Sequence, residues 1–200
     1  MNYFITGTDT DVGKTIACAW LMLHMNANYW KPIQSGLEQK DIDAVKKYTA
    51  LPDERFFPSA LELTQPLSPH ESAKRDNIEI SLHDFALPQS DRPLIIEGAG
   101  GLLVPINKQC FISDLIKHLN VPTIIVCRSG LGTINHTLLT LEALRVNRIN
   151  IKGIIMSGEK SPHNREALEE YGHAPIIAEI DFLSDITPEA LKDIQPEIAL

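Results

Sequence analysis

A loop near the N-terminus, between an apolar run and a long helical segment, constrains the fold of this chain most strongly. It reads GTDTDVGKT over residues 7–15, after the apolar NYFIT and before GKTIACAWLMLHMNA at 13–27. A strand, a loop ending in Gly-Lys-Thr and a helix form the context in which phosphate-binding loops occur. The usual loop has four residues between its glycines, whereas five separate Gly7 from Gly13 and Thr8 takes the first glycine position. Because the context is intact, we interpret the loop as a nucleotide site.

The physical basis of such a site is a helix N-terminus that presents backbone N–H groups to a phosphate. The N–H groups of residues 11–15 would point inward, where the helix dipole favours an anion. In a loop of this kind Lys14 is expected to reach the β- and γ-phosphates, and the hydroxyl of Thr15 is expected to bind Mg²⁺. The alternative is an ordinary polar turn, in which Thr10 or Asp11 caps the helix.

Short apolar runs alternate with segments of helical periodicity along the rest of the chain. Strands are expected at 2–6, 28–33, 92–98, 121–127, 151–157 and 174–180, and helices at 13–27, 112–119, 133–146, 163–172 and 187–194. The later runs are rich in Ile and Val without polar alternation, as are strands covered on both faces. The pattern predicts a single α/β domain over residues 1–200, with a mostly parallel sheet flanked by helices, similar to phosphate-loop NTPases.

The segment from about residue 48 to residue 92 departs from this pattern. It is rich in proline and contains LPDERFFPS and TQPLSPHES, with no long periodic run. We expect an irregular excursion with one or two short helices there, rather than a linker between two domains.

Composition and charge narrow the class of function. The formal net charge is −8, whereas nucleic acids and anionic membranes are bound by clustered Lys and Arg, so neither is an expected partner. No apolar run approaches the length of a membrane span. Cys18, Cys110 and Cys127 lie far apart and form neither a metal-binding spacing nor a disulfide framework, and no basic residue precedes Lys14 as in a signal peptide. These features predict a cytoplasmic protein.

A second motif, IIEGAGG at 95–101, places an acid at the end of an apolar run. Phosphate-loop enzymes place a second acidic contact to Mg²⁺ at such a position, and Glu97 would serve here directly or through water. The glycines that follow allow the backbone to approach a ligand closely. Taken alone, the motif is equally compatible with a glycine-rich turn beside a surface glutamate.

Two further fragments offer charged residues near the same edge of the predicted sheet. KPIQSG places Lys31 at the carboxyl end of a strand and Ser35 in the loop after it, where ligands bind in open α/β sheets. KDIDAVKKY offers Asp41 and Asp43, of which at most one faces inward, because residues two apart do not share a helix face. Each fragment alone also fits a solvated surface turn or a charged helix start.

Together the fragments resemble the signatures of the dethiobiotin synthetase family. GTDTDVGKT, KPIQSG, TQPLSPH, EGAGGLLVP and GLGTINHTLLT resemble that family's segments in order, so the likeness covers about residues 2–160. Thr-Asp-Thr within the loop is not a generic feature of phosphate-binding loops. The resemblance implies an ATP-dependent ligase of biotin biosynthesis. In that reaction 7,8-diaminopelargonic acid and CO₂ give the cyclic urea of dethiobiotin through a carbamate and a carbamic-phosphoric anhydride, with ATP as co-substrate.

The resemblance also implies roles for individual residues. It implies that Lys31, Lys14 and Thr10 are catalytic and that Ser35 and Asn135 bind the diamine substrate. The nucleotide-binding positions that it implies are Asp11, Val12, Gly13, Lys14, Thr15, Ile16, Asp43, Glu97, Gly98, Ala99, Gly100, Ser157, Asp181 and Glu189. The Mg²⁺ ligands that it implies are Thr15, Asp43 and Glu97, which favours Asp43 over Asp41. It further implies a homodimer, with Asn135 serving a site shared across the interface.

Two positions near the expected base depart from the family pattern. Ser157 stands where an asparagine often contacts the adenine edge, and Asp181 stands where proline is common. A serine hydroxyl cannot span the donor and acceptor of that edge as an amide does, so weak discrimination between bases is expected. Glu189 matches a ribose-contacting glutamate only after a shift of one residue.

Other classes of phosphate-loop protein stay open as alternatives. A cofactor-precursor amidoligase would normally continue into a glutamine-hydrolysing domain. A regulatory nucleotide switch would carry an extra lysine near the start of the loop and a basic segment that seeks DNA or membrane, and the sequence has neither. An inactive nucleotide-binding module is disfavoured because Lys14, Thr15, Lys31 and Glu97 are all in place.

Overall fold

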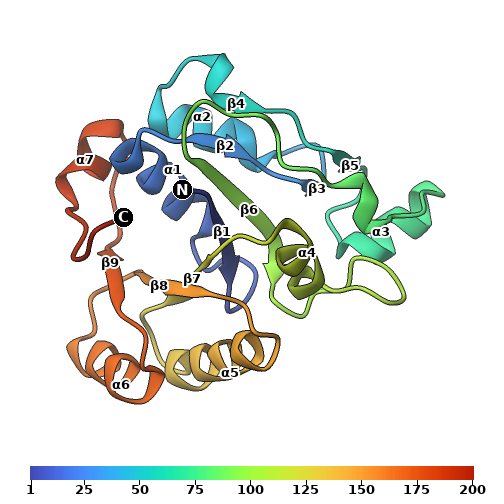
Figure 1. The fold of residues 1–200 in the computed structure, drawn as a ribbon. Coiled ribbons are helices and arrows are strands. Elements are labelled where there is room, and N and C mark those ends of the chain that lie inside the picture. Colours follow the sequence, from blue (N-terminus) through green and yellow to red (C-terminus); the bar gives the residue numbers. More distant parts are fainter.

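A seven-stranded, all-parallel sheet forms the centre of the computed structural model, which describes all 200 residues (Figure 1). From one edge to the other its strands are β4 (Phe56–Phe57), β2 (Asn28–Trp30), β6 (Leu94–Gly101), β1 (Tyr3–Gly7), β7 (Thr123–Arg128), β8 (Ile151–Ser157) and β9 (Ile176–Ile180). The predicted α/β class with a parallel sheet is confirmed. From β1 the chain runs to β2 and β4, returns to β6 between β2 and β1, and then continues to β7, β8 and β9 on the other side, so the connectivity reverses beside β1.

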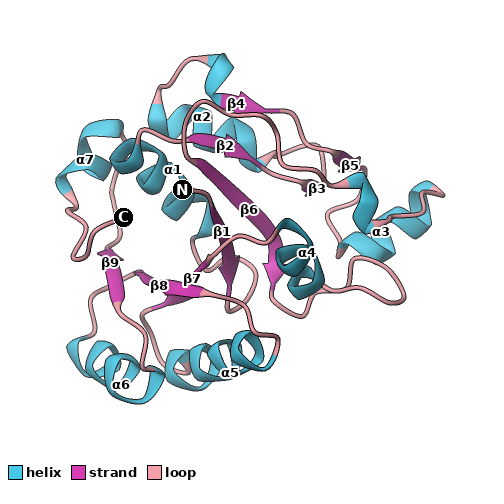
Figure 2. Ribbon diagram, viewed as in Figure 1, coloured by secondary structure: helices cyan, strands magenta, loops and turns pink.

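Helices cover both faces of the sheet (Figure 2). On one face lie α1 (Lys14–Met25), α2 (Asp41–Thr49) and α7 (Pro188–Asp193), and on the other lie α4 (Ile112–Leu119), α5 (Thr133–Val146) and α6 (Pro162–Gly172). None of these helices combines the length and the apolar character that a membrane span requires. Outside residues 28–92, the strand and helix positions agree with the sequence-based predictions to within a few residues.

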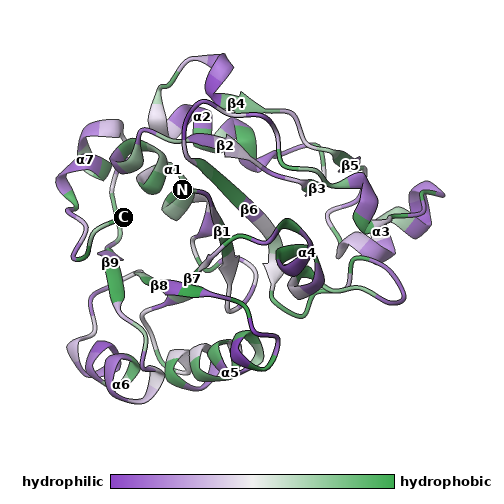
Figure 3. Cartoon of the chain, viewed as in Figure 1, coloured by the Kyte–Doolittle hydropathy of each residue, from purple (hydrophilic) through white to green (hydrophobic).

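Alternation along the strands divides the core into two buried clusters. On β1, Tyr3 and Ile5 join the cluster under α1, while Phe4 between them joins the cluster under α4 and α5. This is the two-residue period of a strand, with both faces apolar because both are covered. In Figure 3 the first part of β6 is hydrophobic, whereas α7 is largely hydrophilic.

Two helices begin on glycines with left-handed backbone, and both point at the same edge of the sheet. Gly13 before α1 has φ 94° and Gly132 before α5 has φ 89°, and no side chain caps either helix. The first N–H groups of a helix have no partner within the helix. At α1 these donors are therefore available to a ligand, and at α5 no side chain competes for them.

The expected strand at 28–33 is divided in two. β2 ends at Trp30, and β3 (Ile33–Ser35) pairs with β5 (Leu61–Leu63) in a separate two-stranded parallel sheet. Pro32 lies at the break, where it cannot donate to a ladder because it has no N–H. The break places Lys31 between the end of β2 and the start of β3.

The segment at 48–92 is more regular than expected. It holds the predicted short helix, α3 (Pro69–Asp76), two 3₁₀ turns at 53–55 and 82–84, and the strands β4 and β5 that were not expected. Arg55 holds this segment to the sheet: its Nε donates to Asn28 Oδ1 and its Nη2 donates to the carbonyl oxygen of Ala27, both at 2.6 Å. The segment therefore extends the sheet edge rather than leaving it.

Gly153 on β8 lies close to the segment that leads into β9. A Cβ at Gly153 would lie 2.6 Å from the carbonyl oxygen of Pro175 and 2.8 Å from Ile177 Cγ1. We expect Gly153→Ala to lower the free energy of unfolding in urea by about 1–3 kcal/mol, since overpacking forces the backbone to shift.

The control for this variant is Gly130→Ala. A Cβ at Gly130 would meet no atom within 4 Å, so this change should leave the free energy of unfolding within about 1 kcal/mol of the wild type. Equal destabilisation by the two changes would contradict the steric explanation.

Candidate active site

One large cavity opens at the carboxyl ends of the central strands. Its volume is about 1520 Å³, and the loops after β1, β6, β7, β8 and β9 border it together with residues 66–69. It lies where the connectivity reverses beside β1, which is the usual ligand position in open α/β sheets. The cavity brings together most of the residues singled out in the sequence. Its wall contains Thr10, Asp11, Val12, Gly13, Lys14, Thr15, Ile16, Lys31, Ser35, Glu97, Ala99, Gly100, Ser157 and Asp181.

The loop between β1 and α1 presents its backbone to this cavity. Asp11 (φ 55°) and Gly13 (φ 94°) both have left-handed backbone, and none of the N–H groups from Asp11 to Ile16 donates to another backbone group. A Cβ at Gly13 would lie 2.9 Å from Ser157 Cβ, so both the conformation and the close neighbour require glycine. The loop thus offers a row of N–H donors at a helix N-terminus, which suits a phosphate.

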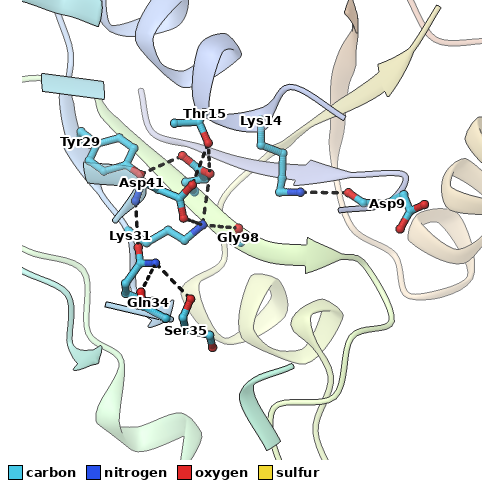
Figure 4. A network of polar contacts seen from close by, with 11 residues as sticks. Asp9, Lys14, Thr15, Tyr29, Lys31, Gln34, Ser35, Asp41 and Gly98 are labelled. Atoms are coloured by element: carbon cyan, nitrogen blue, oxygen red, sulfur yellow. Dashed lines mark hydrogen bonds and ion pairs between the residues drawn. The ribbon is translucent and has the colours of Figure 1, made fainter. Parts of the chain in front are cut away.

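Lys14 folds back along this loop and is buried. Its Nζ donates to the carbonyl oxygen of Asp9 at 3.0 Å (Figure 4). Burial lowers the pKa of Lys14 from its usual value, while the Glu97 carboxylate acts in the opposite direction. A poorly hydrated ammonium at this position gains strongly from an anion entering the cavity.

Lys31 is the second buried cation of the site. Its Nζ lies 2.8 Å from Asp41 Oδ2, 3.2 Å from Glu97 Oε1 and 3.1 Å from the carbonyl oxygen of Gly98 (Figure 4). Burial alone would lower the pKa of Lys31, but the carboxylates of Glu97 and Asp41 outweigh this effect and raise it. Lys31 therefore carries a positive charge throughout the physiological pH range. Gly98 contributes this carbonyl but does not line the cavity.

Three oxygen-bearing side chains converge beside Lys31. The hydroxyl oxygen of Thr15 lies 2.9 Å from Asp41 Oδ1 and 3.1 Å from Glu97 Oε1. Burial would raise the pKa of Asp41, but Lys31 reverses this effect and holds it below its usual value, so the carboxylate is ionised. Hydroxyl and carboxylate oxygens are ligands that Mg²⁺ accepts, usually with one or two carboxylates and phosphate oxygens of a substrate. The donor set fits Mg²⁺ beside a phosphate chain.

The expectation that Asp43 faces the site is wrong, and Asp41 takes that position. Asp43 is exposed and does not line the cavity, whereas Asp41 does. The backbone N–H of Asp41 donates to Oε1 of the buried Gln34 at 3.2 Å, which fixes where α2 begins and which way its first turn faces. This contact is tertiary, so the local helical pattern could not reveal the register.

Two other expected residues lie outside the cavity of their own chain. Glu189 is exposed on α7 and does not contribute to the wall, so the structure does not support the one-residue shift behind its assignment. Asn135 is exposed on the first turn of α5. Ser35, in contrast, lines the cavity with a buried hydroxyl oxygen that has no hydrogen-bond partner.

The sequence analysis missed several residues of the wall. Arg128, at the end of β7, donates from Nη2 to the carbonyl oxygen of Thr10 at 3.0 Å and so braces the loop. The wall also contains the apolar residues Phe182, Leu183 and Ile186 that follow β9, and Phe182 is 81% exposed. An arginine directly after a buried strand was a readable signal. No sequence signal identified the apolar residues after β9 as part of the wall.

Solved structures with a similar fold include a ParA family ATPase and a MinD protein. The ParA family ATPase of Chlorobium tepidum TLS matches 96% of this chain and 88% of its own, with a TM-score of 0.52 at 16% identity. The septum site-determining protein MinD of Pyrococcus horikoshii OT3, solved with Mg-ADP, matches 98% of this chain and 87% of its own, with a TM-score of 0.51 at 14% identity. At these identities the likeness establishes the fold alone.

Sequence relatives identify the family more narrowly. A family model described as an AAA domain matches residues 1–190. An ATP-dependent dethiobiotin synthetase of Paramagnetospirillum magneticum is 48% identical over 96% of this chain and 94% of its own length. One from Lawsonia intracellularis is 46% identical over 97% of this chain and 94% of its own length. With this identity over nearly the whole chain, the protein belongs to the ATP-dependent dethiobiotin synthetase family.

Proposed function

We propose that this protein is an ATP-dependent ligase that forms the ureido ring of dethiobiotin from 7,8-diaminopelargonic acid and CO₂. The observation that carries the proposal is the meeting of two buried lysines in one cavity. Lys14 comes from the phosphate-binding loop and Lys31 from the break after β2, and both border the space in front of Thr15 and Glu97. A γ-phosphoryl group there would have a cation on each side.

The loop and its neighbours would hold the nucleotide. The N–H groups from Asp11 to Ile16 would bind the β- and γ-phosphates, with Lys14 beside them. Thr15, Asp41 and Glu97 are the side chains that would hold Mg²⁺. When bound, Mg²⁺ would neutralise charge that develops on the phosphate oxygens. The apolar part of the wall that contains Phe182 would receive the base.

The reaction needs positioning more than covalent participation by the protein. One amine of the diamine adds to CO₂ and loses a proton, which gives a carbamate. A carbamate oxygen then takes the γ-phosphoryl group of ATP and ADP leaves. The second amine attacks the carbonyl carbon, loses a proton, closes the ring and expels phosphate. Lys14, Lys31, Thr10 and Ser35 would hold the carbamate against the γ-phosphate, and such alignment accounts for much of the rate in phosphoryl transfer.

The site of the substrate's remote carboxylate would be completed by a second copy of the chain. Asn135 is exposed beside the N-terminus of α5, which no side chain caps and whose dipole favours an anion. In its own chain Asn135 does not border the cavity, although Leu131, four residues earlier, does. We infer a homodimer in which Asn135 of each subunit serves the partner's cavity.

The direct test is to incubate the protein with MgATP, ¹³C-bicarbonate and 7,8-diaminopelargonic acid. We expect dethiobiotin carrying one ¹³C atom in its ring, with one ADP formed for each product molecule, as measured by mass spectrometry. Hydrolysis of ATP without labelled dethiobiotin would refute the proposal and favour a nucleotide switch.

Lys31→Ala should abolish most of this ligation. Removing a preorganised contact to charge that develops in the transition state typically costs a factor of ~10² or more in kcat. The control is Lys40→Ala, because Lys40 pairs with Glu62 at 2.8 Å outside the cavity. Near-normal turnover by Lys31→Ala would discard the proposed mechanism.

The two aspartates of α2 should differ in their effect on the metal dependence. Asp41→Asn removes a carboxylate that lies beside Thr15 and Lys31, so we expect the Mg²⁺ concentration for half-maximal rate to rise about tenfold or more. Asp43→Asn is the matched control on the exposed face and should leave the titration unchanged. A larger effect of Asp43→Asn would show that the first turn of α2 rotates when substrates bind.

The shared site can be tested by mixing two impaired variants. Asn135→Ala should raise KM for the diamine with little change in nucleotide affinity. If Asn135 serves the partner's cavity, mixed dimers of Asn135→Ala and Lys31→Ala contain one intact site, and a random mixture regains about a quarter of the wild-type rate. No recovery at diamine concentrations below KM, or a chain that sediments as an active monomer, would contradict the shared site.

A further inference from the structure

Tyr29 is a buried residue that none of the sequence motifs contains, and it contacts the site from the core side. It lies on β2 opposite Ile95 of β6, and its side chain belongs to the cluster under α1. Glu97 follows Ile95 by two residues on the same strand and so points to the same face. The strand pairing therefore brings the tyrosine ring beneath the glutamate.

The two oxygens of the Glu97 carboxylate have different partners. The Tyr29 hydroxyl donates to Oε2 at 2.8 Å (Figure 4). Oε1 lies 3.1 Å from the Thr15 hydroxyl and 3.2 Å from Lys31 Nζ, on the side of the cavity. One oxygen is thus held by the core, and the other faces the groups that would surround the metal and the phosphate.

This arrangement fixes the plane of the carboxylate. Glu97 is 1% exposed and Tyr29 is wholly buried, so no water competes for Oε2. The Tyr29 hydroxyl donates to Oε2 from within the core. Without that donor Oε2 would be a buried, unpaired oxygen, and the carboxylate would turn to share the partners of Oε1.

We infer that Tyr29 is a positioning residue, which holds Glu97 with Oε1 directed at the Mg²⁺ of the bound nucleotide. The inference rests on the proposed function, because Glu97 is a metal ligand only under it. Groups that orient a metal ligand from behind commonly change metal affinity 10–100-fold when they are removed. The tyrosine would therefore act on the reaction without touching any substrate.

The test is Tyr29→Phe, which keeps the ring and removes only the hydroxyl. We expect the Mg²⁺ concentration for half-saturation, measured by calorimetry with the non-hydrolysable β,γ-imido analogue of ATP, to rise about tenfold or more. In the ligation assay, excess Mg²⁺ should restore most of the lost kcat. Tyr29→Met, which fills similar space without a hydroxyl, should show the same rise if the phenylalanine variant is poorly folded.

Tyr3→Phe is the matched control. Tyr3 is also wholly buried and lies in the same cluster, but its hydroxyl contacts Met1 Sδ at 3.1 Å and is not bonded to Glu97. This change should leave Mg²⁺ binding unaltered, even if it lowers the free energy of unfolding as much as Tyr29→Phe does.

The outcomes separate the inference from the proposed function. Unchanged Mg²⁺ binding in Tyr29→Phe, or an equal change in both tyrosine variants, would overturn the positioning role. The calorimetric measurement needs no diamine. A protein that makes no dethiobiotin but loses Mg²⁺ affinity only in Tyr29→Phe would refute the proposed reaction and retain the role of Tyr29.

Discussion

The site depends on one physical constraint: a lysine ammonium buried away from water must be paired with carboxylates. Asp41 and Glu97 lie 2.8 and 3.2 Å from Lys31 Nζ. Removing one partner from such a cluster leaves an uncompensated buried charge, at a cost of about 3–5 kcal/mol. Three separate parts of the chain must therefore arrive together, namely the break after β2, the first residue of α2 and the middle of β6. Because the cluster joins these three parts, the site is ordered only when this edge of the sheet is packed.

Much of the fold was predictable because its signals are local and long. The helices at 112–119 and 133–146 begin and end at the predicted residues, since their periodicity runs over two or more turns. β4 and β5 were missed because two or three residues are too short to show a period. The break at Pro32 was readable in principle, because proline cannot continue a ladder on its N–H side. The predicted strand at 28–33 runs across this proline and is therefore wrong there.

The site was predictable where the chemistry lies within one loop and not where it depends on packing between elements. The phosphate-binding loop and Glu97 carry their own motifs. The choice between Asp41 and Asp43 depends on Gln34, seven residues before α2 begins. Tyr29 meets Glu97 only because β2 and β6 pair in one particular register, and no pattern within β2 reveals that register. A sequence motif does not identify residues such as Tyr29, which act only through another side chain.

The same fold occurs in a ParA family ATPase and in MinD, so the sheet and the phosphate-binding loop do not by themselves distinguish a ligase from other nucleotide-binding proteins. The distinction has to come from groups that a nucleotide alone does not need. Ser35 is such a group, because its buried hydroxyl borders the cavity without a hydrogen-bond partner. An unsatisfied buried polar group costs about 1–3 kcal/mol in the free protein. Under the proposed function, a second substrate would supply the missing hydrogen bond beside Lys31 and recover that cost. A switch that binds only ATP gains nothing from this hydroxyl, whereas a ligase that must hold a carbamate against the γ-phosphate does.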